Sequence, residues 1–184
     1  MSVIRKNHMH ILRLTTDALL AALLVVFSMF LTIPTPIMKI SFNSLPVLLC
    51  AFYCGIPDAV AVALIGKTVE QSILYGIDFT TPFWIAPFVF MAICAGLMHK
   101  RFYKKKETPL RLFLIILVCE LVLTLTNTLF LILLGNLVVG ELANFLFAVL
   151  PMRLLPLVGR LVITGTVLPL AIPVLSRTLP VREG

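Results

Sequence analysis

Three polar side chains fall on one face of an otherwise apolar helical segment. Lys67, Glu70 and Gln71 are spaced i, i+3 and i+4 within the run 58–75, with Gly66 beside them. Residues at this spacing are neighbours on a helix surface. The stripe predicts one of two arrangements: a ligand cavity lined by a cation, an anion and an amide, or an internal Lys67–Glu70 ion pair that neutralises its own charges.

The composition around this stripe makes its charges costly. The chain has 184 residues, of which 60% are hydrophobic and 12% are charged, whereas soluble domains carry about 25% charged residues. Its mean hydropathy is +1.11. The predicted class is therefore an integral membrane protein. A charge at the centre of a bilayer costs roughly 2.5–3.5 kcal/mol or more, so the charges inside apolar runs predict a functional site or a partner.

Apolar runs separated by Pro, Gly and charged residues predict an all-α membrane protein, a bundle of six transmembrane helices in a single domain, residues 1–184. The expected helices lie near 15–32, 44–56, 58–75, 83–99, 110–135 and 143–175. The second is short, and the last is long enough to be tilted or broken. Five or six spans leave no room for a soluble catalytic or nucleotide-binding domain, so any ATP-driven step is expected to use another chain.

The basic residues predict the orientation of the bundle. With six spans, one side of the membrane carries Arg5, Lys6, Arg13, Lys100, Arg101, Lys104, Lys105, Lys106, Arg111, Arg177 and Arg182. The opposite side carries only Lys39. Because Lys and Arg accumulate in cytoplasmic loops, both termini are predicted to be cytoplasmic. The net charge of +7 is then a topology signal that also suits anionic lipid, and no nucleic acid is expected as a partner.

Depth along the helices brings two further residues to the level of the stripe. At 1.5 Å per residue, Asn127 lies past the midpoint of its helix towards the outside. Arg153 lies about ten residues from the outer end of the last helix. Both are expected to meet Glu70 and Gln71.

Glu120 and Arg160 form a second predicted pair. They lie at similar depth, nearer the cytoplasmic half of their helices. Since each charge needs a partner in a medium of low dielectric constant, a structural ion pair between the two helices is expected. We therefore leave both residues out of the predicted binding site.

Two outer segments are candidate lids. The segment 32–44 is rich in Pro and contains Lys39, Phe42 and Asn43. The segment 75–84 gathers aromatic residues, an acid and hydroxyls, and it ends at Trp84. Tyr and Trp also form belts at the membrane interface, so these aromatics fit either an interfacial role or stacking on a planar ligand.

No cofactor or metal is expected. All four cysteines lie in apolar runs, where a thiol behaves as a small hydrophobe. Cys50 and Cys54 are one helical turn apart, but no His or further Cys joins them at the spacing of a four-ligand zinc site. The three His residues fall in predicted loops, so an intramembrane enzyme lacks an evident nucleophile and base.

Several motifs together resemble the substrate-binding S component of an energy-coupling factor (ECF) transporter, most of all the folate-type S components. The resemblance covers the whole chain. It is carried by the six spans, by the A-x-x-x-A spacing of Ala18 and Ala22, and by the run 33–42 that leads into Leu45-Pro46-Val47. It also includes Thr126-Asn127-Thr128 and Pro151-Met152-Arg153.

The resemblance implies a prokaryotic, multi-pass subunit of the cell membrane. Such a subunit binds a vitamin from outside and docks on a coupling transmembrane protein with two ATPases. The resemblance also implies that Ala18 and Ala22 contact the coupling protein, and that the bundle topples in the membrane to carry its site inside. Folate is the leading substrate, although folate-type members carry an arginine near the outer end of the first helix, where this chain has Ser28-Met29-Phe30.

The sequence leaves alternatives for the identity of the ligand and for the class of transporter. Cobalamin and pantothenate fit the same class of subunit, and a self-sufficient ion-coupled secondary transporter would use the charged stripe as an ion relay. A dicarboxylate such as folate is expected to meet a cation of the site. The predicted ligand-binding residues are Lys39, Phe42, Asn43, Lys67, Glu70, Gln71, Trp84, Asn127 and Arg153.

Overall fold

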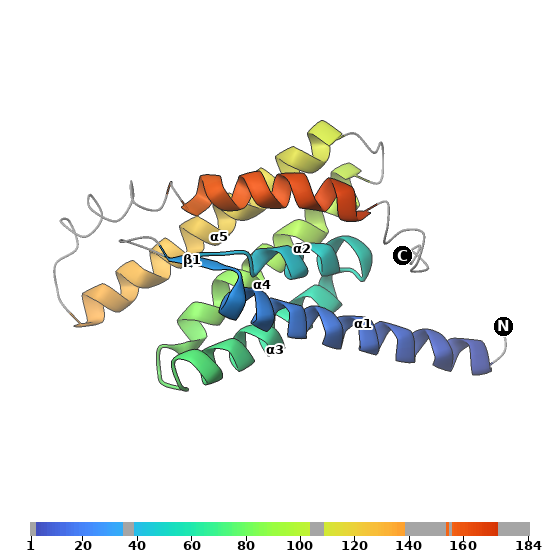
Figure 1. Cartoon of the computed structure of the whole chain (residues 1–184), viewed down its shortest axis with the longest axis horizontal. Coiled ribbons are helices and arrows are strands. Elements are labelled where there is room, and N and C mark those ends of the chain that lie inside the picture. The colour runs from blue at the N-terminus through green and yellow to red at the C-terminus, as the bar shows by residue number, and fades with distance from the viewer. Residues whose placement is uncertain (1–2, 35–38, 104–108, 139–153, 155, 173–184) are drawn as a thin grey trace.

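The described part of the chain is a bundle of six α-helices. The computed structural model describes residues 3–34, 39–103, 109–138, 154 and 156–172 (Figure 1). The helices are α1 (Val3–Phe30), α2 (Ser44–Tyr53), α3 (Ile56–Leu74), α4 (Thr81–Met98), α5 (Pro109–Val138) and a last, unlabelled helix, Pro156–Ile172. The predicted all-α architecture with six helices is thus confirmed.

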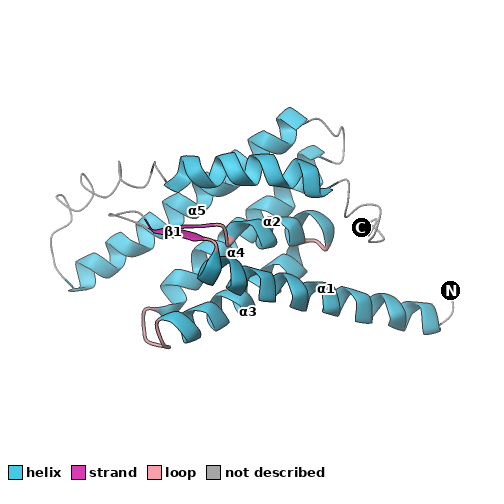
Figure 2. Ribbon diagram, in the orientation of Figure 1, coloured by secondary structure: helices cyan, strands magenta, loops and turns pink. Residues whose placement is uncertain are grey.

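Two short elements interrupt the helices (Figure 2). Strands β1 (Thr32–Pro34) and β2 (Lys39–Ser41) form an antiparallel hairpin between α1 and α2, within the segment expected as an outer loop. A π-helical turn, His99–Tyr103, continues α4. The hairpin lets the chain reverse between two helices while its backbone groups pair with each other.

Among the described residues, the helix boundaries differ from the expected ones mainly at the start of the chain. The first helix begins at Val3 rather than near residue 15. The polar residues before position 11 end the apolar run, but a helix needs no apolar residues to continue outside a membrane. The last helix is described only over Pro156–Ile172. The rest of its expected range, 143–155 and 173–175, lies outside the described residues apart from Leu154.

Among the described residues, three helices are long and apolar enough to cross a membrane. They contain the segments Ile11–Phe30, Thr81–Phe102 and Leu110–Leu134. The remaining three are shorter or more polar: α2 has 10 residues, about 15 Å of helix, and α3 carries Asp58, Lys67 and Glu70. The bundle therefore combines three long apolar helices with shorter or more polar ones among the described residues.

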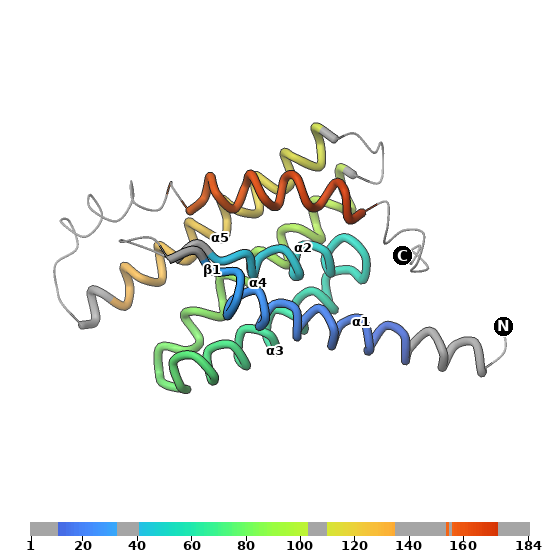
Figure 3. The backbone as a smooth tube through the Cα atoms, viewed as in Figure 1, coloured from blue at the N-terminus to red at the C-terminus, as the bar shows by residue number. Residues whose placement is uncertain are grey.

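Helix α2 lies inside the bundle rather than at its surface. It packs against α1, α3 and α4 (Figure 3), and every residue from Ser44 to Phe52 is buried. At its end, the Tyr53 hydroxyl donates a hydrogen bond to the carbonyl oxygen of Ile172. A short helix can be accommodated here because its neighbours, not lipid, surround it.

The two ends of the bundle differ. The hairpin and the α3–α4 loop lie at one end, which we call the hairpin end (Figure 1). Helix α1 begins, and the helix Pro156–Ile172 ends, toward the opposite end. An ion pair between Arg13 and Asp58 joins α1 to α3. The large apolar side chains on the outside, such as Leu14 and Phe30, are what a lipid-facing surface requires.

Two glycines occupy backbone positions where a side chain would cause strain or a clash. Gly55 has φ of +99° and reverses the chain between α2 and α3, a conformation that glycine adopts without steric cost. Gly96 of α4 lies against the start of α3, where an added Cβ would be 2.3 Å from Cγ1 of Ile56. Helix α4 therefore approaches α3 this closely only because position 96 lacks a side chain.

We predict that Gly96→Ala lowers the stability of the bundle by about 1–3 kcal/mol, because the new methyl group overpacks the α3–α4 contact. Thermal unfolding in detergent measures the effect. Gly165→Ala is the matched control, since its Cβ meets Phe113 at an ordinary 3.4 Å. The double variant Gly96→Ala/Ile56→Ala is expected to lose less than the sum of the two single changes. Strict additivity would contradict the proposed clash.

Candidate functional site

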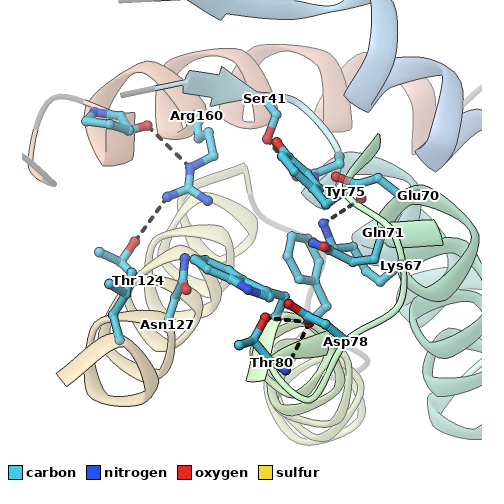
Figure 4. A pocket seen from close by; sticks show the side chains of 15 residues that line it. Ser41, Lys67, Glu70, Gln71, Tyr75, Asp78, Thr80, Thr124, Asn127 and Arg160 are labelled. Carbon is cyan, nitrogen blue, oxygen red and sulfur yellow. Dashed lines mark hydrogen bonds and ion pairs between the residues drawn. The ribbon is translucent and has the colours of Figure 1, made fainter. Parts of the chain in front are cut away.

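A cavity of about 570 Å³ opens at the hairpin end of the bundle. This volume lies within the range of about 300–1,000 Å³ that is usual for small-molecule sites. Its wall comes from the end of the hairpin, α3, the α3–α4 loop, α4, α5 and the helix Pro156–Ile172 (Figure 4). The lining residues are Ser41, Asn43, Lys67, Glu70, Gln71, Tyr75, Asp78, Thr80, Trp84, Phe88, Thr124, Asn127, Leu131, Pro156 and Arg160.

The charged stripe of α3 forms one side of this cavity. Lys67, Glu70 and Gln71 are all buried and all line it. Nζ of Lys67 donates to Oε2 of Glu70 at 2.5 Å, and it lies 4.5 Å from the centre of the Phe88 ring. The two arrangements left open by the sequence therefore coexist: the ion pair forms, and both of its members face the cavity.

The opposite side comes from α5 and the last helix. Thr124 and Asn127 lie three residues apart on one face of α5, and both line the cavity. Trp84 of α4 lines both the main cavity and a small neighbouring hollow that it shares with Asn127. This side offers amide and hydroxyl hydrogen-bonding groups next to an aromatic surface, a combination that binds planar polar molecules.

Glu120 and Arg160 form the predicted ion pair. Nε of Arg160 lies 3.6 Å from Oε2 of Glu120, and the other oxygen of the fully buried Glu120 accepts a hydrogen bond of 2.7 Å from the Ser44 hydroxyl. The expected pairing is confirmed. Contrary to what that pairing led us to expect, Arg160 also lines the cavity, next to Thr124 (Figure 4).

The α3–α4 loop is held at the mouth of the cavity by Asp78. Its Oδ1 accepts hydrogen bonds from the Thr80 hydroxyl at 2.7 Å and from the backbone N–H groups of Thr80 and Thr81 at 3.0 and 3.1 Å. These bonds, that of the Thr80 hydroxyl first, lower the pKa of the exposed Asp78 carboxyl. The ionised carboxylate thus caps the start of α4 and orders the loop around it.

The cavity gathers most of the side chains that the sequence predicted for the ligand. Six of them line it: Asn43, Lys67, Glu70, Gln71, Trp84 and Asn127. Phe42 is buried beside them without lining the cavity. The side chain of Lys39 and all of Arg153 lie outside the part of the chain that the structure describes.

Sequence reasoning missed other lining residues for which helical spacing held a signal. Phe88 follows Trp84 by four residues, and Thr124 precedes Asn127 by three, so each shares a face with a predicted residue. Tyr75, Asp78 and Thr80 belong to the segment expected as a lid. Leu131 and Pro156 are apolar residues among many, and nothing in their pattern distinguishes them.

A second polar cluster lies away from the cavity. The ligand atoms of Asp17, Cys50 and Cys54 are all within 4.8 Å of one another, and the Cys50 thiol lies 3.7 Å from Oδ1 of Asp17. The structure thus adds a carboxylate to the two cysteines that the sequence had left without a third ligand. Three donors are one fewer than a structural zinc site uses, and the neighbouring Arg13 adds positive charge.

The described helices form a largely apolar bundle that holds a polar cavity of small-molecule size. The family model for the substrate-specific component of ECF transporters matches residues 12–174. The chain therefore belongs to this family. It is a multi-pass membrane protein and a transport subunit rather than an enzyme, and membership favours this assignment over a self-sufficient carrier.

One solved structure is similar over nearly its whole length. It is described as the S component of a bacterial ECF transporter, and it shares 20% sequence identity with this chain and a TM-score of 0.56. The similarity covers 91% of this chain and 97% of that chain. At this identity it shows a common fold. No curated protein matches the sequence.

We predict that Lys67→Met destabilises the bundle by about 3–5 kcal/mol, because Glu70 keeps a buried charge without its partner. The side chains of Lys67 and Glu70 are only 5% and 7% exposed. The double variant Lys67→Met/Glu70→Met is expected to recover most of the loss, since no charge is left unpaired. Thermal unfolding in detergent compares them, with Ser72→Ala, at an exposed site of α3, as the control. A double variant no more stable than the single one would refute mutual neutralisation.

Proposed function

We propose that the chain captures a vitamin in the cavity at the hairpin end and delivers it to an ECF coupling module. One observation carries this proposal: a polar cavity of ligand size inside an apolar bundle of the S-component family. Asn43, Lys67, Glu70, Gln71, Trp84 and Asn127 are proposed to contact the vitamin from the cavity wall, and Lys39, Phe42 and Arg153 remain predicted contacts.

Folate is the leading ligand. Three amides, Asn43, Gln71 and Asn127, face the cavity and can bond both donors and acceptors of a pterin-like ring. Trp84 and Phe88 supply aromatic surface for such a ring. Pantothenate, a smaller carboxylate, also suits this size and polarity. Cobalamin suits it less, because its macrocycle is much bulkier than the molecules that occupy pockets of this volume.

Docking is proposed to use the exposed face of α1. Ala18 and Ala22 are both exposed on this helix, one turn apart, which leaves room for another helix to approach closely. We propose that a coupling transmembrane protein packs there and that two ATPases drive the cycle. In this scheme both termini are cytoplasmic, the hairpin end faces outside, and the bundle topples to release its ligand.

A thermal-shift screen of B vitamins with the purified chain tests the ligand. A bound vitamin at 100 times its Kd adds about 2.7 kcal/mol to stability by mass action, so the true ligand is expected to raise the Tm clearly. Arg153→Ala is expected to weaken the binding of an anionic vitamin. An unchanged affinity would remove Arg153 from the site, and a panel without any shift would count against vitamin capture.

A bulky residue on α1 tests the docking face. We predict that Ala18→Trp or Ala22→Trp abolishes co-purification with the coupling protein and ATPases while vitamin binding is retained, because the indole blocks close helix approach. Leu125→Trp is the matched control, since position 125 is also exposed but lies on α5 rather than on α1. If both alanine variants still assemble, the docking face lies elsewhere.

A further inference from the structure

Arg160 projects into the cavity with its hydrogen-bonding capacity largely unused. It lies in the first turns of the helix Pro156–Ile172, and its guanidinium faces the cavity across from Lys67 (Figure 4). Nη2 donates to Thr124 Oγ1 at 3.3 Å, and Nε donates to the carbonyl oxygen of Pro156 at 3.4 Å. Both distances exceed the 2.7–3.2 Å that is usual for such bonds.

The ion pair with Glu120 neutralises Arg160 without saturating it. Oε2 of Glu120 is 3.6 Å from Nε and accepts no hydrogen bond from the described residues. The other oxygen is occupied by Ser44. Nη1 of Arg160 has no hydrogen-bond partner in the described part of the chain. A guanidinium has five N–H donors in a fixed fork, so several remain available to a ligand.

Lys67 shows the contrast. Its ammonium group is 2.5 Å from Glu70 and sits over the ring of Phe88. Glu70 therefore neutralises the charge of Lys67, and the contacts with Glu70 and Phe88 fix the position of its ammonium group. Lys67 and Arg160 are the two cations that the structure describes on the cavity wall. Lys67 also keeps unused N–H donors, but its carboxylate partner lies at 2.5 Å, whereas that of Arg160 lies at 3.6 Å. Only Arg160 offers a planar fork that can bind an anion through two N–H groups at once.

We propose that Arg160 binds an anionic group of the ligand, and that this ligand carries a carboxylate or a phosphate. This inference rests on the proposed vitamin capture in the same cavity. The guanidinium fork matches both groups in a bidentate manner. Thr124 and Asn127, on the neighbouring face of α5, add hydrogen bonds to the same group. The aromatic side, Trp84 and Phe88, then takes the uncharged part of the molecule.

Titration calorimetry on the purified full chain tests the proposal. The probes are folate and pantothenate as carboxylates, thiamine monophosphate and pyridoxal phosphate as phosphates, and riboflavin and pyridoxine without an acid group. We expect a probe of the first or second group to bind, and the group that binds tells carboxylate from phosphate. Arg160→Gln is expected to weaken that binding about tenfold to hundredfold, and Arg160→Lys less. Arg101→Gln, at an exposed site away from the cavity, is the control.

Removing the charge from the ligand completes a thermodynamic cycle. For a carboxylate ligand, its methyl amide replaces the acid; for a phosphate ligand, the dephosphorylated vitamin does so. The wild type is expected to prefer the charged form, and Arg160→Gln to bind both forms alike, because the lost interaction is the same one. Arg160→Gln leaves Glu120 without a cation, so Arg160→Gln/Glu120→Gln provides a second background in which no buried charge is unpaired.

The outcomes distinguish a failure of the proposed Arg160 role from a failure of the proposed vitamin capture. Suppose that the wild type binds an anionic vitamin and that Arg160→Gln and Arg160→Gln/Glu120→Gln both keep its affinity and its preference for the charged form. Arg160 then does not bind the anionic group, although vitamin capture stands. Tight binding confined to riboflavin or pyridoxine also overturns the proposed Arg160 role alone. If no vitamin of the panel binds, the proposed function fails, and the Arg160 role fails with it.

Discussion

The neutralisation of Lys67 by Glu70 is the constraint on which the cavity depends. An isolated charge in a bundle of this composition would be excluded by its solvation cost. The pair lies on consecutive turns of α3, so it is assembled by one helix before any tertiary contact forms. A cation–π contact between Lys67 and Phe88 then joins this side to α4. Polar groups can line the hollow because its strongest charges compensate each other locally.

Long-range polar contacts hold the other side of the cavity in position. Ser44, at the start of α2, binds Glu120 of α5, which in turn faces Arg160 of the last helix. Three elements that are distant in sequence are thus connected through one buried carboxylate. Ser44 follows the hairpin almost directly, so this chain of contacts connects the hairpin to the cavity wall.

The sequence predicted what local spacing and composition determine. Six helices and the shared face of Lys67, Glu70 and Gln71 follow from apolar runs and the helical period, and both appear in the structure. The Glu120–Arg160 pair followed from depth and the need for a partner. Because these charges compensate each other, we left Arg160 out of the predicted site, yet its side chain lines the cavity. The crossing of three helices decides which N–H groups of a paired guanidinium face the cavity. The residue pattern of a single helix contains no information about that crossing.

The hairpin and the start of the first helix were not predictable for a different reason. The segment 32–44 has the Pro content of a loop, and only pairing between its two halves turns it into strands. Helix α1 begins at Val3, before its apolar run, and an apolar run marks only the part of a helix that suits lipid. Neither feature is encoded in an apolar repeat, so hydrophobic patterning carries little information about them.

The distribution of charge also bears on how such a subunit moves its cargo. The side chains of Lys67, Glu70 and Glu120 are nearly or fully buried, while residues such as Leu19, Ile65, Leu125 and Val162 cover the outside. A bundle built this way keeps an apolar surface toward lipid when it tilts as one body, because its ionic groups move with their partners. A carrier that opened between its helices would instead separate Arg160 from Glu120 inside the bilayer. The proposed toppling of the bundle as one body would leave both of these ion pairs intact.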